Sequence, residues 1–249
     1  MNFVIIPAGG IGRRMGQEAL PKQFAQLGGT PLIMRVLRQF DDFSDIDSII
    51  VGAPPDYSDA LREMARGCGI KKLAAVIQGG ATRQETVYKC LSIAKMRAGA
   101  FKSDIVMIHD AARPFVTQEI INENLRSAEE HGTAVTAVKV KDATFKSRDG
   151  SIAGEIVPRE GLYLAQTPQT FRFSLIFEAH ENAITQGIKN ALDDASLVQA
   201  IGFPVRMVGG SSFNFKVTTP DDMALAQAIA DILPKIPESD LTAFTNEGR

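Results

Sequence analysis

The sequence has 249 residues, of which 45% are apolar and 22% charged, and its formal net charge is −2 at pH 7. This balance is typical of a globular protein with a sizeable core, and it excludes a basic field for nucleic acid or an acidic membrane; no apolar run approaches the roughly 18 residues of a spanning helix. Cys68 and Cys90 lack a metal or redox spacing and the N-terminus lacks a signal-peptide pattern, which predicts reduced thiols and a cytoplasmic location.

Short apolar runs alternate with helical patterns along most of the chain. The run at 3–8 is apolar throughout, as a strand covered on both faces must be, and Leu32, Val36 and Phe40 then recur at helical spacing. Further strands are predicted at 46–54, 73–80, 104–114, 133–140 and 204–210, and further helices at 57–69, 82–96, 117–132, 173–187 and 218–233. This alternation predicts an α/β fold with a doubly wound, mostly parallel sheet.

Residues 139–161 break the alternation. Polar and apolar residues alternate there around a turn signal at 148–150, which predicts a β-hairpin. Because such a hairpin would expose its edges, we expect an arm that packs against a second copy of the chain in a homodimer. We therefore predict a single domain over 1–235 with an inserted β-arm at 138–160, followed by a polar tail at 236–249.

The first predicted strand leads into the segment PAGGIGRRMG. Gly9, Gly10 and Gly12 remove side chains directly after the strand, so successive backbone N–H groups could turn toward one anion. The segment lacks the Lys-Ser or Lys-Thr of a Walker A loop. Its spacing, Gly10-x-Gly12-x-x-x-Gly16, is one residue longer than the dinucleotide fingerprint.

Cations accompany these glycines. Arg13 and Arg14 lie on the loop and Lys22 follows it in PKQF. They predict a loop that binds a triphosphate without hydride-transfer chemistry. The alternative is a glycine-rich turn with solvated arginines.

Polar residues also follow the third predicted strand. Gly80 allows another close approach of the backbone to a ligand, and Arg83 and Thr86 lie beside it. In an open α/β sheet ligands bind at the carboxyl ends of the strands, so these residues are expected to share the edge with the glycine loop.

Two further segments are expected at the same edge. Asp110 ends the fourth strand and is a hard oxygen ligand suited to Mg²⁺, while Arg113 could hold a phosphate. Lys216 ends a late strand. Taken singly, Asp110 could cap a helix and Lys216 could be a solvated edge lysine. Together, cations around a glycine loop in a net-negative protein predict a polyanionic ligand.

These residue types suit nucleotidyl transfer, in which an acceptor phosphate oxygen displaces pyrophosphate from the α-phosphorus of a nucleoside triphosphate. Both reactants are anions, so positioned cations and Mg²⁺ can overcome their repulsion without a covalent nucleophile. The absence of a GxSxG elbow from the sequence agrees with this expectation.

Six segments then identify a family: PAGGIGRRMG…PKQF, GGATRQETV, HDAARPF, QTPQTF, DDAS and NFKVTTPDD. In this order, and over nearly the whole chain, they resemble the 2-C-methyl-D-erythritol 4-phosphate cytidylyltransferases of the non-mevalonate isoprenoid pathway. Close relatives of that family are the ribitol-5-phosphate cytidylyltransferases. The resemblance implies a Rossmann-like nucleotidyltransferase fold, Mg²⁺-dependent transfer from CTP to a polyol phosphate, and a homodimer joined through the arm.

The resemblance also implies roles for individual residues. The catalytic cations that hold the triphosphate and stabilise the transition state are Arg14, Lys22 and Lys216. The nucleotide contacts, made largely through the backbone, come from Pro7, Ala8, Gly9, Gly10, Gly12, Gly80, Arg83 and Thr86. The acceptor contacts come from Asp110, Arg113, Thr144, Arg159 and Thr167. Of these, Asp110 would hold Mg²⁺, and Thr144 and Arg159 would reach from the arm into the site of the second copy.

Three departures from the family pattern bear on the acceptor. The loop reads PAGG, which the ribitol relatives share; DATFK in the arm has one additional residue; and Leu192 replaces a threonine before DDAS. HDAARP and DDAS favour methylerythritol phosphate. We therefore predict a transferase that makes CDP-methylerythritol and pyrophosphate. The alternatives are a ribitol-5-phosphate cytidylyltransferase, a non-catalytic nucleotide-binding module and a hydride-transfer enzyme.

Overall fold

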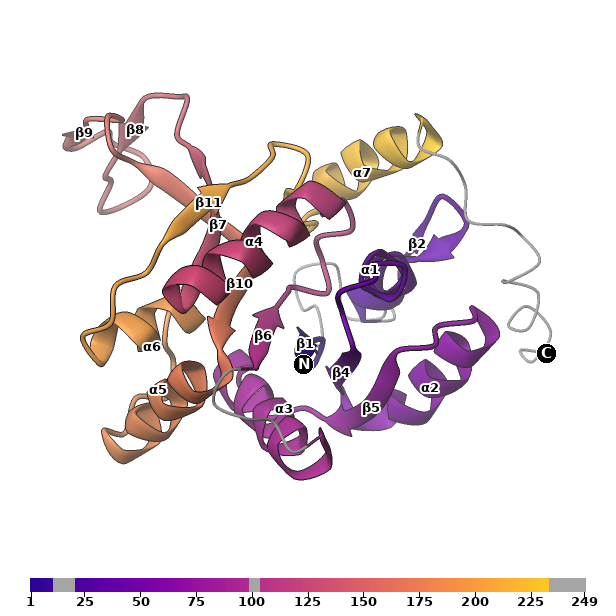
Figure 1. The fold of residues 1–249 in the computed structure, drawn as a ribbon. Coiled ribbons are helices and arrows are strands. Elements are labelled where there is room, and N and C mark those ends of the chain that lie inside the picture. Colours follow the sequence, from indigo (N-terminus) through magenta and orange to yellow (C-terminus); the bar gives the residue numbers. More distant parts are fainter. Residues whose placement is uncertain (11–20, 99–103, 233–249) are drawn as a thin grey trace.

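A seven-stranded sheet forms the centre of the molecule in the computed structural model, which describes residues 1–10, 21–98 and 104–232 (Figure 1). Its strands are β1 (Asn2–Pro7), β4 (Ser48–Ala53), β5 (Leu73–Gln78), β6 (Ile105–Ile108), β7 (Thr133–Lys139), β10 (Tyr163–Arg172) and β11 (Met207–Gly209). They lie in the order β11-β7-β10-β6-β1-β4-β5. Only β10 is antiparallel to its neighbours within this described sheet, so the predicted mostly parallel sheet is confirmed.

Helices cover both faces of the sheet. One buried cluster joins it to α1 (Leu32–Asp41), α2 (Ser58–Gly67), α4 (Gln118–His131) and α7 (Pro220–Ile232). A second cluster joins it to α3 (Arg83–Ala98), α5 (Phe173–Thr185) and α6 (Asp194–Ala200). None of the described helices is long and apolar enough to cross a membrane.

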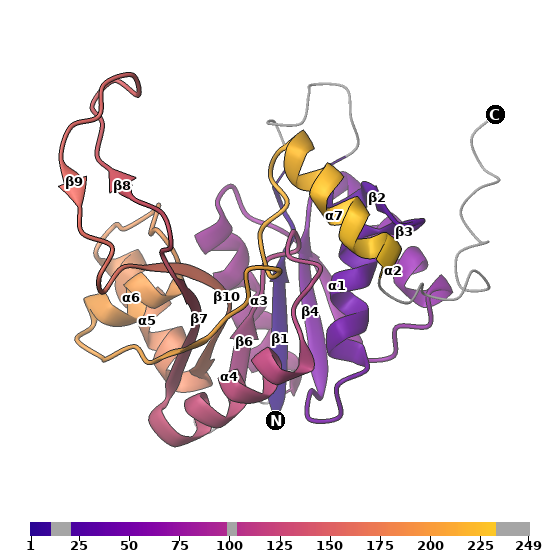
Figure 2. The same ribbon diagram turned by 90° about the horizontal axis from the view of Figure 1, so that it is seen from above.

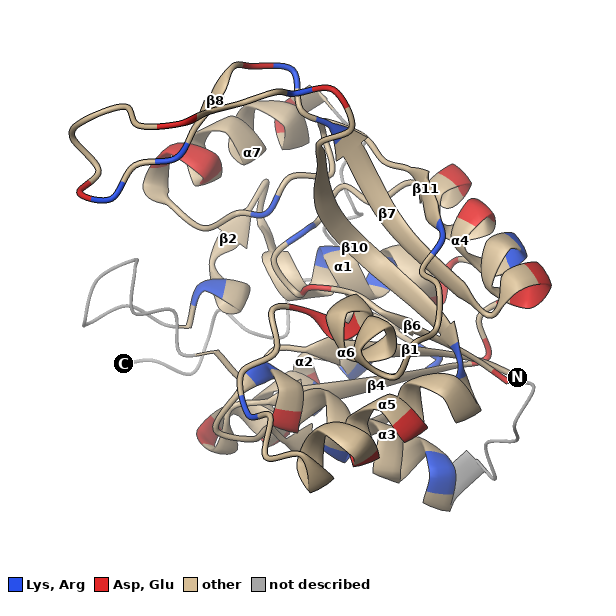
Figure 3. Cartoon of the chain, turned by 90° about the vertical axis from the view of Figure 1, so that its left-hand side faces the viewer, with Lys and Arg blue, Asp and Glu red and all other residues tan. Residues whose placement is uncertain are grey.

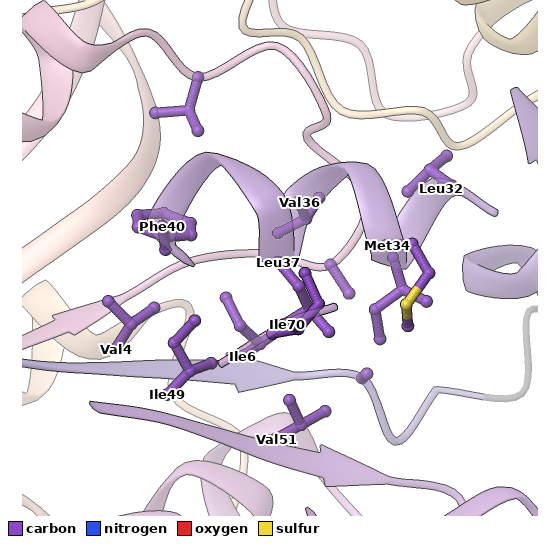
Figure 4. Packing of buried hydrophobic residues seen from close by; sticks show 14 of the residues in the cluster. Val4, Ile6, Leu32, Met34, Val36, Leu37, Phe40, Ile49, Val51 and Ile70 are labelled. Carbon is purple, nitrogen blue, oxygen red and sulfur yellow. The ribbon is translucent and has the colours of Figure 1, made fainter. Parts of the chain in front are cut away.

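Strand β1 explains why the first apolar run is continuous. Val4 and Ile6 belong to the first buried cluster, whereas Phe3 and Ile5 belong to the second. Each face of the strand therefore needs apolar side chains. Figure 4 shows the first cluster, in which labelled side chains of α1 lie over those of β1 and β4.

The residues at 139–161 form the predicted arm. Its strands, β8 (Thr144–Phe145) and β9 (Ile156–Val157), pair antiparallel and project from the body of the molecule (Figure 2). Acidic and basic residues are interspersed along it (Figure 3). At the turn, the Asp149 carboxylate accepts hydrogen bonds from backbone N–H groups, and these bonds lower its pKa to about 2. The hairpin is confirmed.

Short elements and helix ends complete the connections. β2 (Gln26–Leu27) and β3 (Thr30–Pro31) pair antiparallel, and 3-10 turns form at Lys22–Phe24 and Pro55–Tyr57. Thr219 is followed by Pro220 and two aspartates, a pattern typical of a helix start, and its Oγ1 accepts from the N–H of Asp222 at 3.2 Å, so Thr219 is the N-cap of α7.

The sequence patterns did not predict β10 or α6. Both lie at the site described next; β10 carries buried polar residues in its middle, and α6 is a helix of only seven residues that begins at the buried Asp194. The predicted domain boundary at 235 and the tail at 236–249 lie outside the described residues and stay predictions.

Candidate active site

Four parallel strands, β1, β4, β5 and β6, place their carboxyl ends at one edge of the sheet. The segments that leave three of them, 8–10, 79–80 and 110–113, carry predicted site residues. Strand β10 lies beside β6, and its pairing with β7 shifts register between Ala165 and Gln169. This shift lies next to Thr167, which contacts the backbone of Asp110. The sheet topology therefore gathers these residues as the sequence predicted.

Glycines allow two backbone segments to approach closely at this edge. A Cβ atom on Gly9 would lie 3.3 Å from Thr86 Oγ1 and 3.7 Å from the Cα of Gly79. A Cβ on Gly79 would lie only 3.3 Å from the Cα of Gly9. The two segments flank a cavity of about 300 Å³, which Gly80 and Lys89 also line. A pocket of this size, walled by backbone, can hold a small planar group.

Two buried side chains hold these backbone segments in place. Gln23 Nε2 donates to the carbonyl oxygens of Ala8 at 2.6 Å and Gly10 at 3.2 Å. Thr86 Oγ1 accepts from the N–H of Gly80 at 2.9 Å. Gln23 and Thr86 are 3% and 2% exposed, so they orient the backbone that would face a nucleotide. Pro7, which ends β1, leads directly into the first segment.

Asp110, just beyond β6, is the centre of a cluster of charges. Lys216 Nζ lies 2.8 Å from Asp110 Oδ2, and Arg113 Nε lies 3.6 Å from the same oxygen. Arg83 Nε lies 3.4 Å from Oδ1. Burial would raise the pKa of Asp110, but the charges of Arg83 and Lys216 outweigh it and hold the pKa well below its usual range. The carboxylate is therefore ionised, and positive charge remains in excess around it.

The cluster cations differ in their access to solvent. The side chain of Lys216 is 40% exposed, whereas that of Arg113 is 11% exposed. Arg113 Nη1 donates to the carbonyl of Asn214 at 2.8 Å, but its Nε has no hydrogen-bond acceptor. The two residues can therefore present cationic donors to an anion that reaches the sheet edge.

Arg83 bridges two buried carboxylates. In addition to Asp110, its Nη1 lies 2.7 Å from Asp194 Oδ2 at the start of α6. Burial lowers the pKa of Arg83, but the charges of Asp194 and Asp110 outweigh it and raise the pKa above its usual value. Asp194 also lies 3.2 Å from His180 Nε2 on α5. Arg83 thus ties the site to α5 and α6, and its predicted contact with the nucleotide stays a prediction.

His109 and Thr167 fix the backbone at Asp110. His109 Nε2 lies 3.0 Å from the carbonyl of Arg113, and because a carbonyl only accepts, this nitrogen carries the hydrogen. Nδ1 then accepts from the Thr167 hydroxyl at 3.2 Å, and Thr167 Oγ1 accepts from the N–H of Asp110 at 3.0 Å. Burial lowers the pKa of His109 to about 4, so the ring is neutral at pH 7.

Lys22 lies at the same edge as Lys216. Its Nζ donates to the carbonyl of Val217 at 3.2 Å, and the N–H of Val217 donates to the carbonyl of Ala112 at 2.8 Å. Of the three predicted catalytic cations, Lys216 pairs with Asp110 and Lys22 contacts the backbone of Val217, the residue that follows Lys216. The third, Arg14, lies outside the described residues, as does Gly12.

The two arm residues lie apart from this cluster. Thr144 Oγ1 donates to the carbonyl of Asp142 at 3.5 Å, and Arg159 Nη1 donates to the carbonyl of Lys141 at 2.7 Å. Within the described part of one chain, the hydrogen bonds and ion pairs of Thr144 and Arg159 do not reach Asp110. Their predicted contact with the acceptor needs a second copy and stays a prediction.

Sequence reasoning missed residues that build the site without facing a ligand: Gln23, His109, Asp194, His180 and Asn214. One signal was present for α6. Asp193 and Ser196 form a capping box there, and their spacing of three residues marks a helix start.

Comparison with known proteins agrees with the geometry. A family model described as 2-C-methyl-D-erythritol 4-phosphate cytidylyltransferase matches residues 2–231. A protein of that name from Geobacillus thermodenitrificans is 41% identical over 230 residues, which cover 92% of this chain and 97% of the relative. A ribitol-5-phosphate cytidylyltransferase from Streptococcus agalactiae serotype III is 35% identical over 231 residues, 93% of this chain and 96% of the relative. Among solved structures, the 2-C-methyl-D-erythritol 4-phosphate cytidylyltransferase from Thermus thermophilus superposes with a TM-score of 0.73 and a sequence identity of 37%. The match covers 92% of this chain and 98% of that protein.

Proposed function

Since the chain belongs to the 2-C-methyl-D-erythritol 4-phosphate cytidylyltransferase family and is therefore a CTP-dependent cytidylyltransferase, we propose that its acceptor is 2-C-methyl-D-erythritol 4-phosphate. The products would be CDP-methylerythritol and pyrophosphate. The observation that carries the reaction class is the charge cluster of Asp110 at the sheet edge, where cations outnumber carboxylates beside a glycine-walled cavity.

The choice of acceptor is supported by the family match and by sequence identity. Identity to the Geobacillus thermodenitrificans relative is 41%, and identity to the Streptococcus agalactiae serotype III relative is 35%, over spans of nearly equal length. The ribitol-5-phosphate name of the second relative makes ribitol 5-phosphate the second candidate.

In the proposed reaction, an oxygen of the acceptor phosphate bonds to the α-phosphorus of CTP, and the bond from that phosphorus to the bridging oxygen of pyrophosphate breaks. The two substrates repel each other, so the site must supply positive charge and alignment. We assign this work to Lys22, which contacts the backbone of Val217, to the neighbouring Lys216, and to Arg14 from the glycine loop. Backbone N–H groups at 8–10 and 79–80 would hold the nucleotide.

We assign the acceptor phosphate to Arg113 and Lys216. Arg113 is oriented by the carbonyl of Asn214, which accepts from its Nη1, and by the ion pair of its Nε with Asp110. Lys216 is the more exposed cation beside Asp110, so it can reach an incoming phosphate without unfolding the loop. Thr167 accepts a hydrogen bond from the backbone N–H of Asp110, whose carboxylate pairs with both cations.

The residues present fit a magnesium ion that arrives with the triphosphate. No cluster of three or more potential ligands occurs among the described residues, but Mg²⁺ is usually held by one or two carboxylates together with substrate phosphates. Asp110 supplies one carboxylate, and it is ionised because its pKa is held well below the usual range by Arg83 and Lys216 despite its burial. When bound, the ion would neutralise phosphate charge and orient the oxygens.

The proposed assembly is a homodimer in which the arm of each chain reaches the site of the other. The arm leaves Phe145, Ile152 and Ile156 at 52%, 71% and 67% exposure, which a second chain could cover. In this assembly Thr144 and Arg159 would grip the acceptor in the neighbouring site.

The test is pyrophosphate release by purified protein with CTP and Mg²⁺, measured in parallel with 2-C-methyl-D-erythritol 4-phosphate and ribitol 5-phosphate. We expect kcat/KM for the first acceptor to exceed that for the second by about 100-fold or more. The reverse preference would move the assignment to ribitol 5-phosphate. No release with either acceptor would contradict the proposal.

Variants check the assignment of the cations. Lys22→Ala and Arg14→Ala should each lower kcat/KM by about 100-fold or more without unfolding the protein. Lys139→Ala, which removes an exposed lysine of β7, should leave kcat/KM unchanged. Near-normal turnover of Lys22→Ala or Arg14→Ala would remove that residue from the catalytic set.

A further inference from the structure

Asn214 lies in the connection between β11 and α7 and is fully buried. Its Nδ2 donates to the carbonyl of Thr167 at 2.8 Å and to Gln166 Oε1 at 3.2 Å. Its own carbonyl accepts from Arg113 Nη1 at 2.8 Å. One residue is therefore bonded to two separate segments of the site, and it precedes Lys216 by two positions in the chain.

These contacts join three parts of the chain that are far apart in sequence. Arg113 follows β6, Thr167 lies within β10, and Lys216 leads into α7. Arg113 and Thr167 are predicted acceptor contacts, and the proposed reaction assigns Lys216 to the acceptor phosphate as well as to the triphosphate. Within the described residues, the hydrogen bonds of Asn214 do not reach the nucleotide side of the site at 8–10 and 79–80, where Gln23 and Thr86 hold the backbone instead.

Packing alone does not explain an asparagine at this position. Asn214 Oδ1 is buried without a hydrogen-bond partner, and a buried polar atom in this state costs free energy. An apolar side chain would avoid that cost. What the amide supplies is two N–H donors, directed at the carbonyl of Thr167 and at Gln166. Room for Gln166 depends on Gly210, because a Cβ there would lie 2.6 Å from Gln166 Oε1.

We propose that Asn214 is a positioning residue for the acceptor phosphate, which acts by fixing Arg113, Thr167 and the Lys216 segment relative to one another. The inference rests on the proposed function. Asn214 touches neither substrate. Its loss would let the three segments shift independently, and small displacements of positioned cations are enough to weaken the binding and alignment of a phosphate.

The matched control is Asn124, the other asparagine that is fully buried among the described residues. Its Nδ2 donates to Thr136 Oγ1 at 2.9 Å, and its Oδ1 accepts from Thr170 Oγ1 at 3.2 Å. It therefore also joins β10 to a neighbouring element, but on the α4 side of the sheet and without contact to Arg113 or Thr167.

The experiment compares Asn214→Ala, Asn214→Ser and Asn124→Ala in the full-length protein, by steady-state kinetics with each substrate varied in turn and by chemical denaturation. We expect both Asn214 variants to lower kcat/KM for the acceptor by about tenfold or more while KM for CTP stays within about twofold. Asn124→Ala should lower stability with both kinetic constants unchanged.

Each other outcome overturns the inference in a distinguishable way. If the wild type turns over the acceptor and the Asn214 variants match Asn124→Ala, Asn214 has only a structural role. If KM for CTP rises by as large a factor as kcat/KM for the acceptor falls, Asn214 does not act selectively on the acceptor side of the site. Failure of both Asn214 variants to fold, while Asn124→Ala folds, would also assign a structural role. If the wild type turns over neither acceptor, the proposed function and this inference fail together.

Discussion

Replacing Arg83 by methionine tests whether the ion pair with Asp194 stabilises the site. Arg83 Nη1 lies 2.7 Å from Asp194 Oδ2, and the Asp194 side chain is 1% exposed. Removing one member of a buried pair costs about 3–5 kcal/mol, because the remaining charge is uncompensated. The Arg83 side chain is 31% exposed, so water screens the pair in part. We therefore expect Arg83→Met to lower the free energy of unfolding by the lower end of this range, about 3 kcal/mol at pH 7.5.

The pH dependence of this loss has a definite sign. Burial would raise the pKa of Asp194, but the charge of Arg83 and the hydrogen bond to His180 outweigh it and lower the pKa in the folded protein. Its contribution to stability is therefore present above the unfolded value near pH 4 and is lost as the pH falls through the folded value. Without Arg83, Asp194 would take up a proton on mild acidification, so the loss should be smaller at pH 5.

Chemical denaturation of Arg83→Met and the wild type at both pH values measures this difference. The matched control is Arg126→Met, because Arg126 pairs with Glu123 on an exposed face of α4 and such pairs contribute less than about 1 kcal/mol. Equal losses for the two variants, or a loss for Arg83→Met that does not shrink at pH 5, would refute the reasoning.

Three further predictions follow from local contacts. Gln23→Glu should raise KM for CTP by about tenfold or more and leave KM for the acceptor within about twofold, because a carboxylate would face two backbone carbonyls; equal changes in steady-state kinetics would contradict this. Asp222→Asn should lower the free energy of unfolding by about 1 kcal/mol at pH 7. Hydrogen bonds from Thr218 and Thr219 lower the pKa of Asp222 to about 2, so its contribution should persist above pH 4 and vanish as the pH approaches 2 in a denaturation series. Burial raises the pKa of Cys90 to about 12, so mass spectrometry at pH 8 should find this thiol alkylated only after unfolding.

Much of the fold could be predicted because its signals are local. The continuous apolar run of β1, the helical spacing in α1, the turn at 148–150 and the cap of α7 each lie within a few residues of one another. Their partners on the sheet are generic apolar surfaces, so the prediction did not depend on which surface they meet.

Strand β10 could not be predicted in this way. Its middle carries Gln166, Thr167, Gln169 and Thr170, which are all buried in the structure although polar. Their partners are distant in sequence: Gln169 Nε2 donates to Asp193, and Thr170 Oγ1 donates to Asn124. A polar strand interior is tolerated only where such partners exist, and no local pattern reveals them.

The site shows the same division. Asp110 and Arg113 follow β6 as predicted, and Lys216 pairs with Asp110. The prediction that Lys216 ends a strand is wrong, because it lies in the connection between β11 and α7, which is held by side-chain contacts and not by a strand ladder. Arg83 was predicted from its place beside a glycine pair, but the sequence could not show that Asp194 would face it from a helix that was itself unpredicted. Family membership as a cytidylyltransferase also decides against the hydride-transfer enzyme and the non-catalytic module.

We propose that the site at this sheet edge transfers the cytidylyl group of CTP to 2-C-methyl-D-erythritol 4-phosphate. The most direct measurement is ³¹P NMR of the wild-type protein with CTP, Mg²⁺ and 2-C-methyl-D-erythritol 4-phosphate. We expect the acceptor phosphomonoester signal to be replaced by two coupled diphosphate signals while pyrophosphate appears in equal amount. Unchanged CTP, or CMP and pyrophosphate with an unchanged acceptor signal, would contradict it.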